Sequence, residues 1–311
     1  MDSEAGRESA PESVHAATVE RVFDVVAETA TEIRAGLPGR RRAIDEENPS
    51  GETQLAADAH ADQLLRERLG SIDGVASYVS EERESKVDAS DGNVSAADPD
   101  GVAVAVDPLD GSSNLRSNNA MGTIVGVYDA PLPAAGRELV AAGYLLYGPI
   151  TTMVVAHGGV VREEVVAPGS GDSGVDRRIV TPELALPDDP VVYGFGGRVP
   201  DWTPEFVAYA EQIERELKLR YGGAMVGDVN QVLTYGGIFS YPALQDRPEG
   251  KLRLQFEANP MAYVVEAAGG RSSDGAGSIL DAEPTELHER TPVHLGNAEL
   301  IERLEGYLSE P

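Results

Sequence analysis

The sequence VAVAVDPLDGSSN, residues 102–114, indicates how the chain folds. Five small and β-branched residues in a row are typical of a strand that is buried on both faces. Pro108 cannot continue the hydrogen-bonding ladder, and Asp110-Gly111 favours a tight turn. The successive amides of residues 111–113 can then form an anion-binding nest at the carboxyl end of the strand. Two aspartates and two serines there suit a metal ion beside a phosphate, whereas the alternative is an ordinary Asp-Gly loop with a serine cap.

Patterns on either side of this strand predict both helices and further strands. Apolar residues at helical spacing from Val19 to Ile33 indicate a helix that ends near Gly36. Asn259-Pro260 is a good helix start, with Asn as the N-cap and Pro at the first helical position. We therefore predict a layered mixed α/β protein. Further helices are expected at 54–69 and 204–218, a helical turn near 225–235, and strands at 75–79, 123–128, 139–147, 151–156, 159–166, 191–195, 238–241 and 251–257.

The middle of the chain marks a boundary between two halves. Residues 168–176 are rich in Gly, Ser and Asp, and residues 182–190 are rich in Pro. Such segments commonly form the loops that connect folded units. We therefore expect an acidic disordered tail over residues 1–12, an N-terminal α/β half over 13–180 and a C-terminal α/β half over 181–311.

The composition excludes several classes of protein. The 311 residues carry 53 Asp and Glu against 25 Lys and Arg, a net charge of −28, so we expect no nucleic-acid partner. The absence of cysteine excludes disulfides and thiolate catalysis. No apolar run reaches the roughly 20 residues of a membrane span, which argues against a membrane partner. The first ten residues are polar and acidic, unlike a secretory signal, so we expect a soluble cytoplasmic protein.

The excess of acids also bears on the solvent in which the protein works. Only three of the 25 basic residues are lysines, and such an acidic, lysine-poor chain fits a protein that stays hydrated in concentrated salt. At about 1 M salt the Debye length is roughly 3 Å, which screens the repulsion between surface carboxylates. We predict a salt-adapted protein, and the alternative is an ordinary acidic enzyme with good solubility.

Carboxylates at other strand and helix ends could join the Asp107–Asp110 turn. Glu81-Glu82 follows a strand, and Glu52 and Asp58 flank the start of the helix at 54–69. In an extended strand over 251–257, the side chains of Lys251, Arg253 and Glu257 would share one face. The alternative is an exposed face with compensating charges. If these segments converge, their all-oxygen ligands favour Mg²⁺ or Mn²⁺ over zinc.

Four motifs closely resemble those of class I fructose-1,6-bisphosphatase: DPLDGSSN, SEER at 80–83, YGGIFSYPA at 235–243 and KLRLQFEANPMAYVVEAAGG at 251–270. The DPLDG turn is shared with the wider inositol-monophosphatase-like, lithium-sensitive phosphatases, whereas the last motif points to the bisphosphatase branch. The resemblance implies hydrolysis of the 1-phosphate of fructose-1,6-bisphosphate to fructose 6-phosphate in gluconeogenesis. It also implies two or three Mg²⁺ ions per site, with Mn²⁺ possible, an N-terminal half that binds metal, a C-terminal half that binds the sugar phosphate, an active site between them, and a homo-oligomer (dimer or tetramer).

The resemblance also assigns roles to individual residues. The implied metal ligands are Glu81, Glu82, Asp107, Asp110, Glu257 and the Leu109 carbonyl. The implied catalytic residues are Glu82, Asp58, Glu52 and Arg253. The implied substrate-binding residues are Asp110, Gly111, Ser112, Ser113, Arg220, Tyr221, Met225, Tyr241 and Lys251.

Some positions depart from the family pattern. Gly196 and Val199 stand where the family has an Asn and a Tyr that hold the distal phosphate, and Arg198 is a candidate to compensate. Gly101-Val102 replaces the Lys-Tyr of AMP-regulated relatives, which argues against AMP inhibition. The altered distal grip leaves open a broader phosphatase acting on sedoheptulose-1,7-bisphosphate or inositol-1-phosphate. A separate alternative is a non-catalytic acidic metal-binding protein whose carboxylates only bind counterions.

Overall fold

The computed structural model describes residues 15–41, 43–47, 53–85, 87–88, 101–169 and 174–309. The tail predicted over residues 1–12 lies outside the described residues, and so does Glu52.

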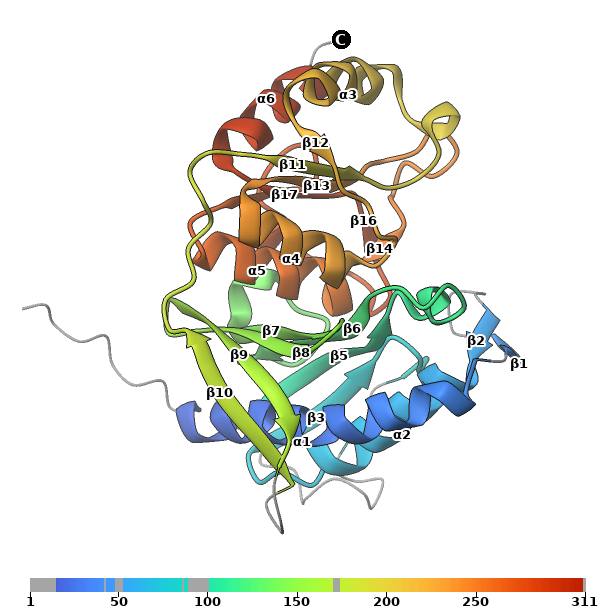
Figure 1. Cartoon of the computed structure of the whole chain (residues 1–311), viewed down its shortest axis with the longest axis vertical. Coiled ribbons are helices and arrows are strands. Elements are labelled where there is room, and N and C mark those ends of the chain that lie inside the picture. The colour runs from blue at the N-terminus through green and yellow to red at the C-terminus, as the bar shows by residue number, and fades with distance from the viewer. Residues whose placement is uncertain are drawn as a thin grey trace, which may run out of the picture.

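The described chain forms five layers in which helices alternate with two β-sheets (Figure 1). Helices α1 and α2 cover one face of a large sheet, α4 and α5 lie between the large and small sheets, and α3 and α6 cover the outer face of the small sheet. This arrangement confirms the predicted layered mixed α/β fold. The helices are α1 (Ala16–Gly36), α2 (Ala56–Leu69), α3 (Pro204–Glu216), α4 (Met225–Tyr235), α5 (Asn259–Ala267) and α6 (Ala298–Ser309).

The large sheet has eight strands, and all but one neighbouring pair run antiparallel; the exception is the parallel pair β3–β5. The central strand β5 is buried along its whole length, as the run of small and β-branched residues predicts. In sheet order the strands are β10 (Val175–Thr181), β9 (Val160–Pro168), β8 (Thr151–His157), β7 (Leu139–Tyr147), β6 (Met121–Tyr128), β5 (Val102–Asp110), β3 (Val75–Ser80) and β4 (Val87–Asp88).

The small sheet has five strands. Its members in order are β12 (Lys218–Leu219), β11 (Val192–Phe195), β13 (Gly237–Tyr241), β17 (Val293–Gly296) and β15 (Arg271–Ser273). Two short antiparallel pairs complete the strands, β1 (Ala43–Glu47) with β2 (Thr53–Leu55) and β14 (Leu252–Arg253) with β16 (Arg290–Thr291).

Three hydrophobic cores hold the layers together. The largest is built around α4 and α5 and contacts both sheets, so it fixes the large sheet relative to the small one. A second core lies under α1 and α2, and a third joins α3 and α6 to the small sheet through an aromatic cluster of Phe195, Trp202, Phe206 and Tyr209. Because α4 and α5 are fully sandwiched, groups from both sheets are held at defined positions.

Two predicted features differ in the structure. Residues 251–257 do not form one strand: only Leu252–Arg253 are extended, and Leu254–Ala258 form a π-helical turn that continues into α5. All five residues of that turn are buried, so the alternation of apolar and polar residues reflects the packing of a turn rather than the two faces of a strand. The segment predicted as a boundary contains β10, which pairs with β9 at the edge of the large sheet. The division of the chain into halves at residue 180 stays a prediction.

Candidate active site

The phosphate loop predicted from the sequence follows β5 directly. Asp107 and Asp110 end the strand, Gly111 adopts a left-handed conformation with φ of 72°, and Ser112–Leu115 form a short 3-10 helix, η3. Gly111 is required for a second reason, since a Cβ atom there would lie 2.2 Å from the Cβ of Ala224, just before α4. The glycine therefore lets the loop after β5 approach the N-terminus of α4 closely.

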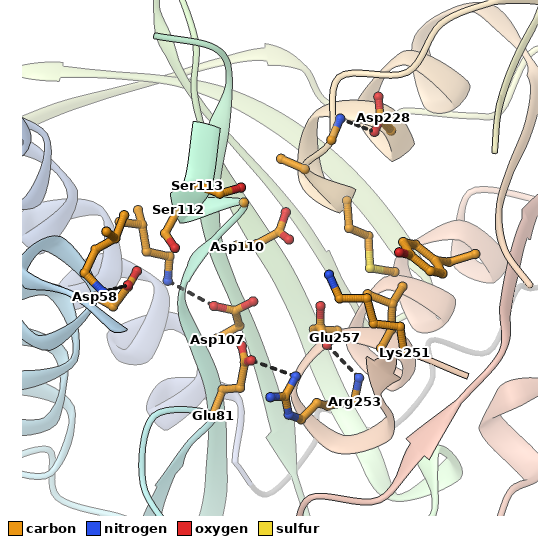
Figure 2. A pocket seen from close by; sticks show the side chains of 18 of the residues that line it. Asp58, Glu81, Asp107, Asp110, Ser112, Ser113, Asp228, Lys251, Arg253 and Glu257 are labelled. Atoms are coloured by element: carbon orange, nitrogen blue, oxygen red, sulfur yellow. Dashed lines mark hydrogen bonds and ion pairs between the residues drawn. The ribbon is translucent and has the colours of Figure 1, made fainter. Parts of the chain in front are cut away.

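Three buried carboxylates form the centre of the site. Asp107, Asp110 and Glu257 each offer an oxygen within 4.8 Å of the others (Figure 2). Each carboxylate is also fixed by a main-chain amide. The Leu109 amide donates to Asp107 at 3.0 Å, the Val226 amide donates to Asp110 at 2.7 Å, and the Arg253 amide donates to Glu257 at 2.6 Å.

The π-helical turn explains how Arg253 and Glu257 both reach this site. The turn brings Glu257 back onto the amide of Arg253, four residues earlier. The Arg253 guanidinium is buried and forms an ion pair with Glu81 at 2.9 Å. Figure 2 shows these side chains converging from the end of the large sheet and from the segment before α5. The structure thus brings these segments together, as considered from the sequence, whereas the strand predicted over residues 251–257 is wrong.

Burial shifts the ionisation of all three central carboxylates. Burial raises the pKa of Asp110 to about 7, with further increases from the charges of Glu81 and Asp228. Burial and the charge of Glu81 raise the pKa of Glu257 to about 8. Burial also raises the pKa of Asp107 well above its usual range, with additional repulsion from Glu81. Carboxylates arranged in this way repel one another unless a cation neutralises them.

The Glu81-Glu82 turn is attached to the other half of the site by two contacts. One is the Arg253–Glu81 ion pair. The other lies outside the lining of the cavity, where Nε2 of His288 lies 2.8 Å from the Arg83 carbonyl oxygen and donates to it. Glu82 is half-buried and lines the same pocket, and its amide donates to the Ser80 hydroxyl at 3.3 Å. The turn therefore keeps both glutamates at the edge of the carboxylate cluster.

The site lies in a cavity of about 300 Å³ that is lined by both halves of the chain. Asp58, at the start of α2, is buried at one side of it, where burial raises its pKa to about 6 and the Leu55 amide donates to it at 2.7 Å. The predicted residues that line the cavity are Asp58, Glu81, Glu82, Asp107, Leu109, Asp110, Gly111, Ser112, Ser113, Tyr221, Met225, Tyr241, Lys251, Arg253 and Glu257.

The far end of the cavity contains the predicted sugar-binding side chains. The Lys251 ammonium lies 5.7 Å from the centre of the Tyr241 ring. A Cβ atom on Gly196 would lie 2.3 Å from the same ring, so Tyr241 occupies space that a side chain at 196 would need. Arg198 does not line the cavity, because its side chain is 83% exposed and pairs with Asp201.

Arg220 is the predicted residue that the structure places elsewhere. It is exposed and does not line the cavity of its own chain. Its amide donates to the Tyr193 carbonyl at 2.7 Å, which holds the backbone at the edge of the small sheet. A role for Arg220 in binding the substrate therefore requires another copy of the chain.

Sequence reasoning missed two charged residues that line the cavity, Asp228 and Arg116. Asp228 is buried in the first turn of α4 and accepts hydrogen bonds from the amides of Gly222 and Gly223. Burial raises its pKa to about 6. Its position in the first turn of a helix was a usable signal, but among 53 acids it did not stand out. Arg116 follows the serines of the loop and belongs to no motif.

The carboxylate cluster fits a divalent metal ion. Asp107, Asp110 and Glu257 form a buried, all-oxygen donor set, and the buried Glu81 beside them adds a fourth carboxylate against the single guanidinium of Arg253. Buried carboxylates at this density are stable in their charged form when they bind cations. Among the described residues, no helix has the length and apolar character of a membrane span.

The five-layer fold and a buried carboxylate cluster beside a phosphate loop define a metal-dependent phosphatase. Comparison with known proteins gives the family. Residues 25–172 match the model of the N-terminal domain of fructose-1-6-bisphosphatase, and residues 186–309 match the model of its C-terminal domain. The chain belongs to the class 1 fructose-1,6-bisphosphatase family, as the four sequence motifs predicted.

Relatives with this name come from halophilic archaea. The chain is 61% identical over 290 residues to the class 1 fructose-1,6-bisphosphatase of Natronomonas pharaonis, which covers 93% of this chain and 98% of the relative. It is 55% identical over 292 residues to that of Halobacterium salinarum, covering 94% of this chain and 98% of the relative. These relatives support the salt adaptation predicted from the net charge.

A solved structure of the family has the same fold. The fructose-1,6-bisphosphatase of Leishmania major in its holo form superposes with a TM-score of 0.85 at 29% identity, over 97% of this chain and all of the other.

Proposed function

We propose that this site hydrolyses the 1-phosphate of fructose-1,6-bisphosphate to fructose 6-phosphate and phosphate, as a phosphoric monoester hydrolase of gluconeogenesis in the cytoplasm. The observation that carries the proposal is a single cavity that contains both a carboxylate cluster and an ammonium group. The cluster consists of Asp107, Asp110 and Glu257, and the ammonium of Lys251 lies beside Tyr241 at the far end of the same cavity. Such a cavity can hold a reacting phosphate and a second, distal phosphate at once. A purely structural acidic cluster needs no phosphate loop and no ammonium group.

Mg²⁺ is the ion that we propose for the site, with Mn²⁺ as an alternative and two or three ions bound together. The oxygens of Asp107, Asp110 and Glu257, with Glu81, Glu82 and the Leu109 carbonyl, would hold them. All-oxygen sites without His or Cys suit these hard cations. When bound, the ions supply Lewis-acid stabilisation of the phosphate charge and of the leaving oxygen.

The remaining steps depend on residues of the chain. Glu82 lies half-buried at the cavity wall and is our candidate for accepting the proton of the attacking water, with Asp58 and Glu52 as supporting acids. A base with a raised pKa keeps a proton it has accepted, and burial raises that of Asp58 to about 6. Arg253 and the amides of the 111–113 loop neutralise charge on the phosphate oxygens in the transition state.

The distal end of the cavity lacks two of the side chains expected to hold a distal phosphate, so other substrates need to be tested. Tyr241 and Lys251 are present there, but Gly196 carries no side chain and Arg198 points to Asp201. A looser grip on the distal phosphate would admit a longer sugar bisphosphate, such as sedoheptulose-1,7-bisphosphate, or a monophosphate such as inositol-1-phosphate.

Phosphate release with Mg²⁺ in molar KCl, measured on these three substrates, tests the proposal. We expect fructose-1,6-bisphosphate to have the highest kcat/KM. A higher value for inositol-1-phosphate would assign the chain to the other branch of the superfamily, and release from none of the three would refute the enzymatic function. Activity highest in dilute buffer would contradict the salt adaptation while leaving the site intact.

We also propose a homo-oligomer, either a dimer or a tetramer, in which Arg220 reaches the site of a neighbouring subunit. Leu219 is 63% exposed and Tyr221 is 44% exposed on either side of Arg220, an apolar edge that a second copy could cover. Arg220→Ala should raise KM about tenfold or more and leave kcat nearly unchanged, because Arg220 would anchor a group remote from the reacting phosphate. Steady-state kinetics check this. An unchanged KM would exclude Arg220 from substrate binding.

A further inference from the structure

The cavity contains a cation that the proposed mechanism does not use. Among the described residues, three cationic side chains line the cavity: Arg116, Lys251 and Arg253. Arg253 is buried and ion-paired with Glu81, and Lys251 lies over the Tyr241 ring. Arg116 is exposed, and within the described part of the chain no hydrogen bond or ion pair joins its guanidinium to any other group. The chain has a net charge of −28, yet no carboxylate of the described residues pairs with this pocket-lining guanidinium. The guanidinium can therefore bind an anionic ligand.

The local backbone directs Arg116 toward the phosphate loop. Arg116 directly follows the 3-10 helix η3, has helical dihedral angles, and donates its amide to the Ser113 carbonyl at 3.2 Å. Residues three apart in a 3-10 helix lie one above the other, so the side chain of Arg116 emerges above that of Ser113. Both residues line the same cavity.

A second arginine fixes the backbone at the end of helix η3. The guanidinium of Arg41 donates to the carbonyl oxygen of Arg116, although the two residues are 75 positions apart in sequence. Arg41 belongs to the basic cluster 40–42, to which the proposed function gives no role. It fixes the backbone of Arg116 and adds positive charge beside the cavity.

We propose that Arg116 is a substrate-binding residue that contacts the phosphate held at the Ser112–Ser113 end of the cavity. The inference rests on the proposed function, since it concerns the phosphate of that substrate. An arginine suits this position because its guanidinium can donate two parallel hydrogen bonds to phosphate oxygens.

The test compares Arg116→Gln, Arg116→Lys and Arg178→Gln in the full chain with Mg²⁺ in molar KCl. Arg178 is an exposed residue of the edge strand β10, which lies away from the loop after β5, and its replacement removes the same charge. For Arg116→Gln we expect both the KM for fructose-1,6-bisphosphate and the inhibition constant of inorganic phosphate to rise about tenfold, the value of a charge-assisted hydrogen bond. Arg116→Lys should restore part of the loss, and Arg178→Gln should match the wild type.

The salt dependence separates contact from long-range attraction. At about 1 M salt the Debye length is roughly 3 Å, so only a charge in contact with the phosphate retains its effect. An effect of Arg116→Gln that appears in dilute salt and vanishes in molar KCl would overturn the proposed contact. Values equal to those of Arg178→Gln at all salt concentrations would overturn it as well.

Direct binding distinguishes failure of this inference from failure of the proposed function. If the wild type released phosphate from no substrate, the proposed function would be wrong, but inorganic phosphate could still be titrated against wild type and Arg116→Gln by ³¹P NMR. Weaker binding to the variant would support the contact, and equal binding would refute it.

Discussion

Asp110→Asn is expected to lower kcat by about a thousandfold or more while the protein remains folded, a loss of roughly 4 kcal/mol of transition-state stabilisation. Asp110 contributes to the carboxylate cluster and begins the phosphate loop, so under the proposed function its charge would hold a metal ion beside the substrate phosphate. Asparagine keeps the oxygen that accepts the Val226 amide at 2.7 Å, and it has almost the same volume. The variant should therefore lose charge without losing the contact between β5 and α4.

Asp228→Asn is the matched control, because it makes the same chemical change in the same cavity. The carboxylate of Asp228 accepts from the amides of Gly222 and Gly223 and is not part of the three-carboxylate cluster. We expect its loss of activity to be about tenfold or less, since the amide oxygen of asparagine can still accept the 2.6 Å hydrogen bond from Gly222 and only the longer bond from Gly223 is lost. The readouts are kcat, the Mg²⁺ concentration for half-maximal activity, and circular dichroism. Equal losses of activity in both variants would show that the loss does not depend on the carboxylate cluster of Asp107, Asp110 and Glu257.

The sequence predicted the centre of the site because local chemistry determines it. A short, uninterrupted run of small and β-branched residues favours a buried strand, and a Pro, an Asp-Gly pair and two serines favour a turn at its end. The observed β5, the left-handed Gly111 and the helix η3 follow from these residues alone. The family motifs added which distant carboxylates join them.

Residues 251–257 show where a periodic pattern misleads. The alternation in KLRLQFE predicts a strand, but a π-helical turn buries successive residues on all sides, so alternation carries no information there. The strand β10 was missed for the opposite reason, because its charged sequence VDRRIVT resembles a loop. Its Arg177 forms ion pairs with the buried Glu164, which only the folded hairpin brings close. The exposed position of Arg220 likewise depends on the packing of the small sheet.

Glu257→Gln is expected to stabilise the metal-free protein at alkaline pH while it lowers kcat by orders of magnitude. Burial and the charge of Glu81 raise the pKa of Glu257 to about 8, above its ordinary value near 4.5. A raised carboxyl pKa means that the folded state holds a proton which the unfolded state has already lost. The corresponding stability is complete below the ordinary pKa and is lost as the pH rises through about 8. Glutamine cannot ionise, so the variant avoids that loss, and its oxygen can still accept the Arg253 amide.

Thermal unfolding in molar KCl with a chelator checks this expectation. The melting temperature of the wild type should fall between about pH 6 and about pH 9, and that of Glu257→Gln should fall less, so that the variant melts several degrees higher at the alkaline end. Mg²⁺ should raise the melting temperature of the wild type most at alkaline pH, because it binds the ionised carboxylates, and should raise that of the variant much less. If the two proteins lost stability in parallel, the raised pKa of Glu257 would not be the source of the pH dependence. The source would then be the ionisation of Asp107 and Asp110, whose pKa values burial also raises.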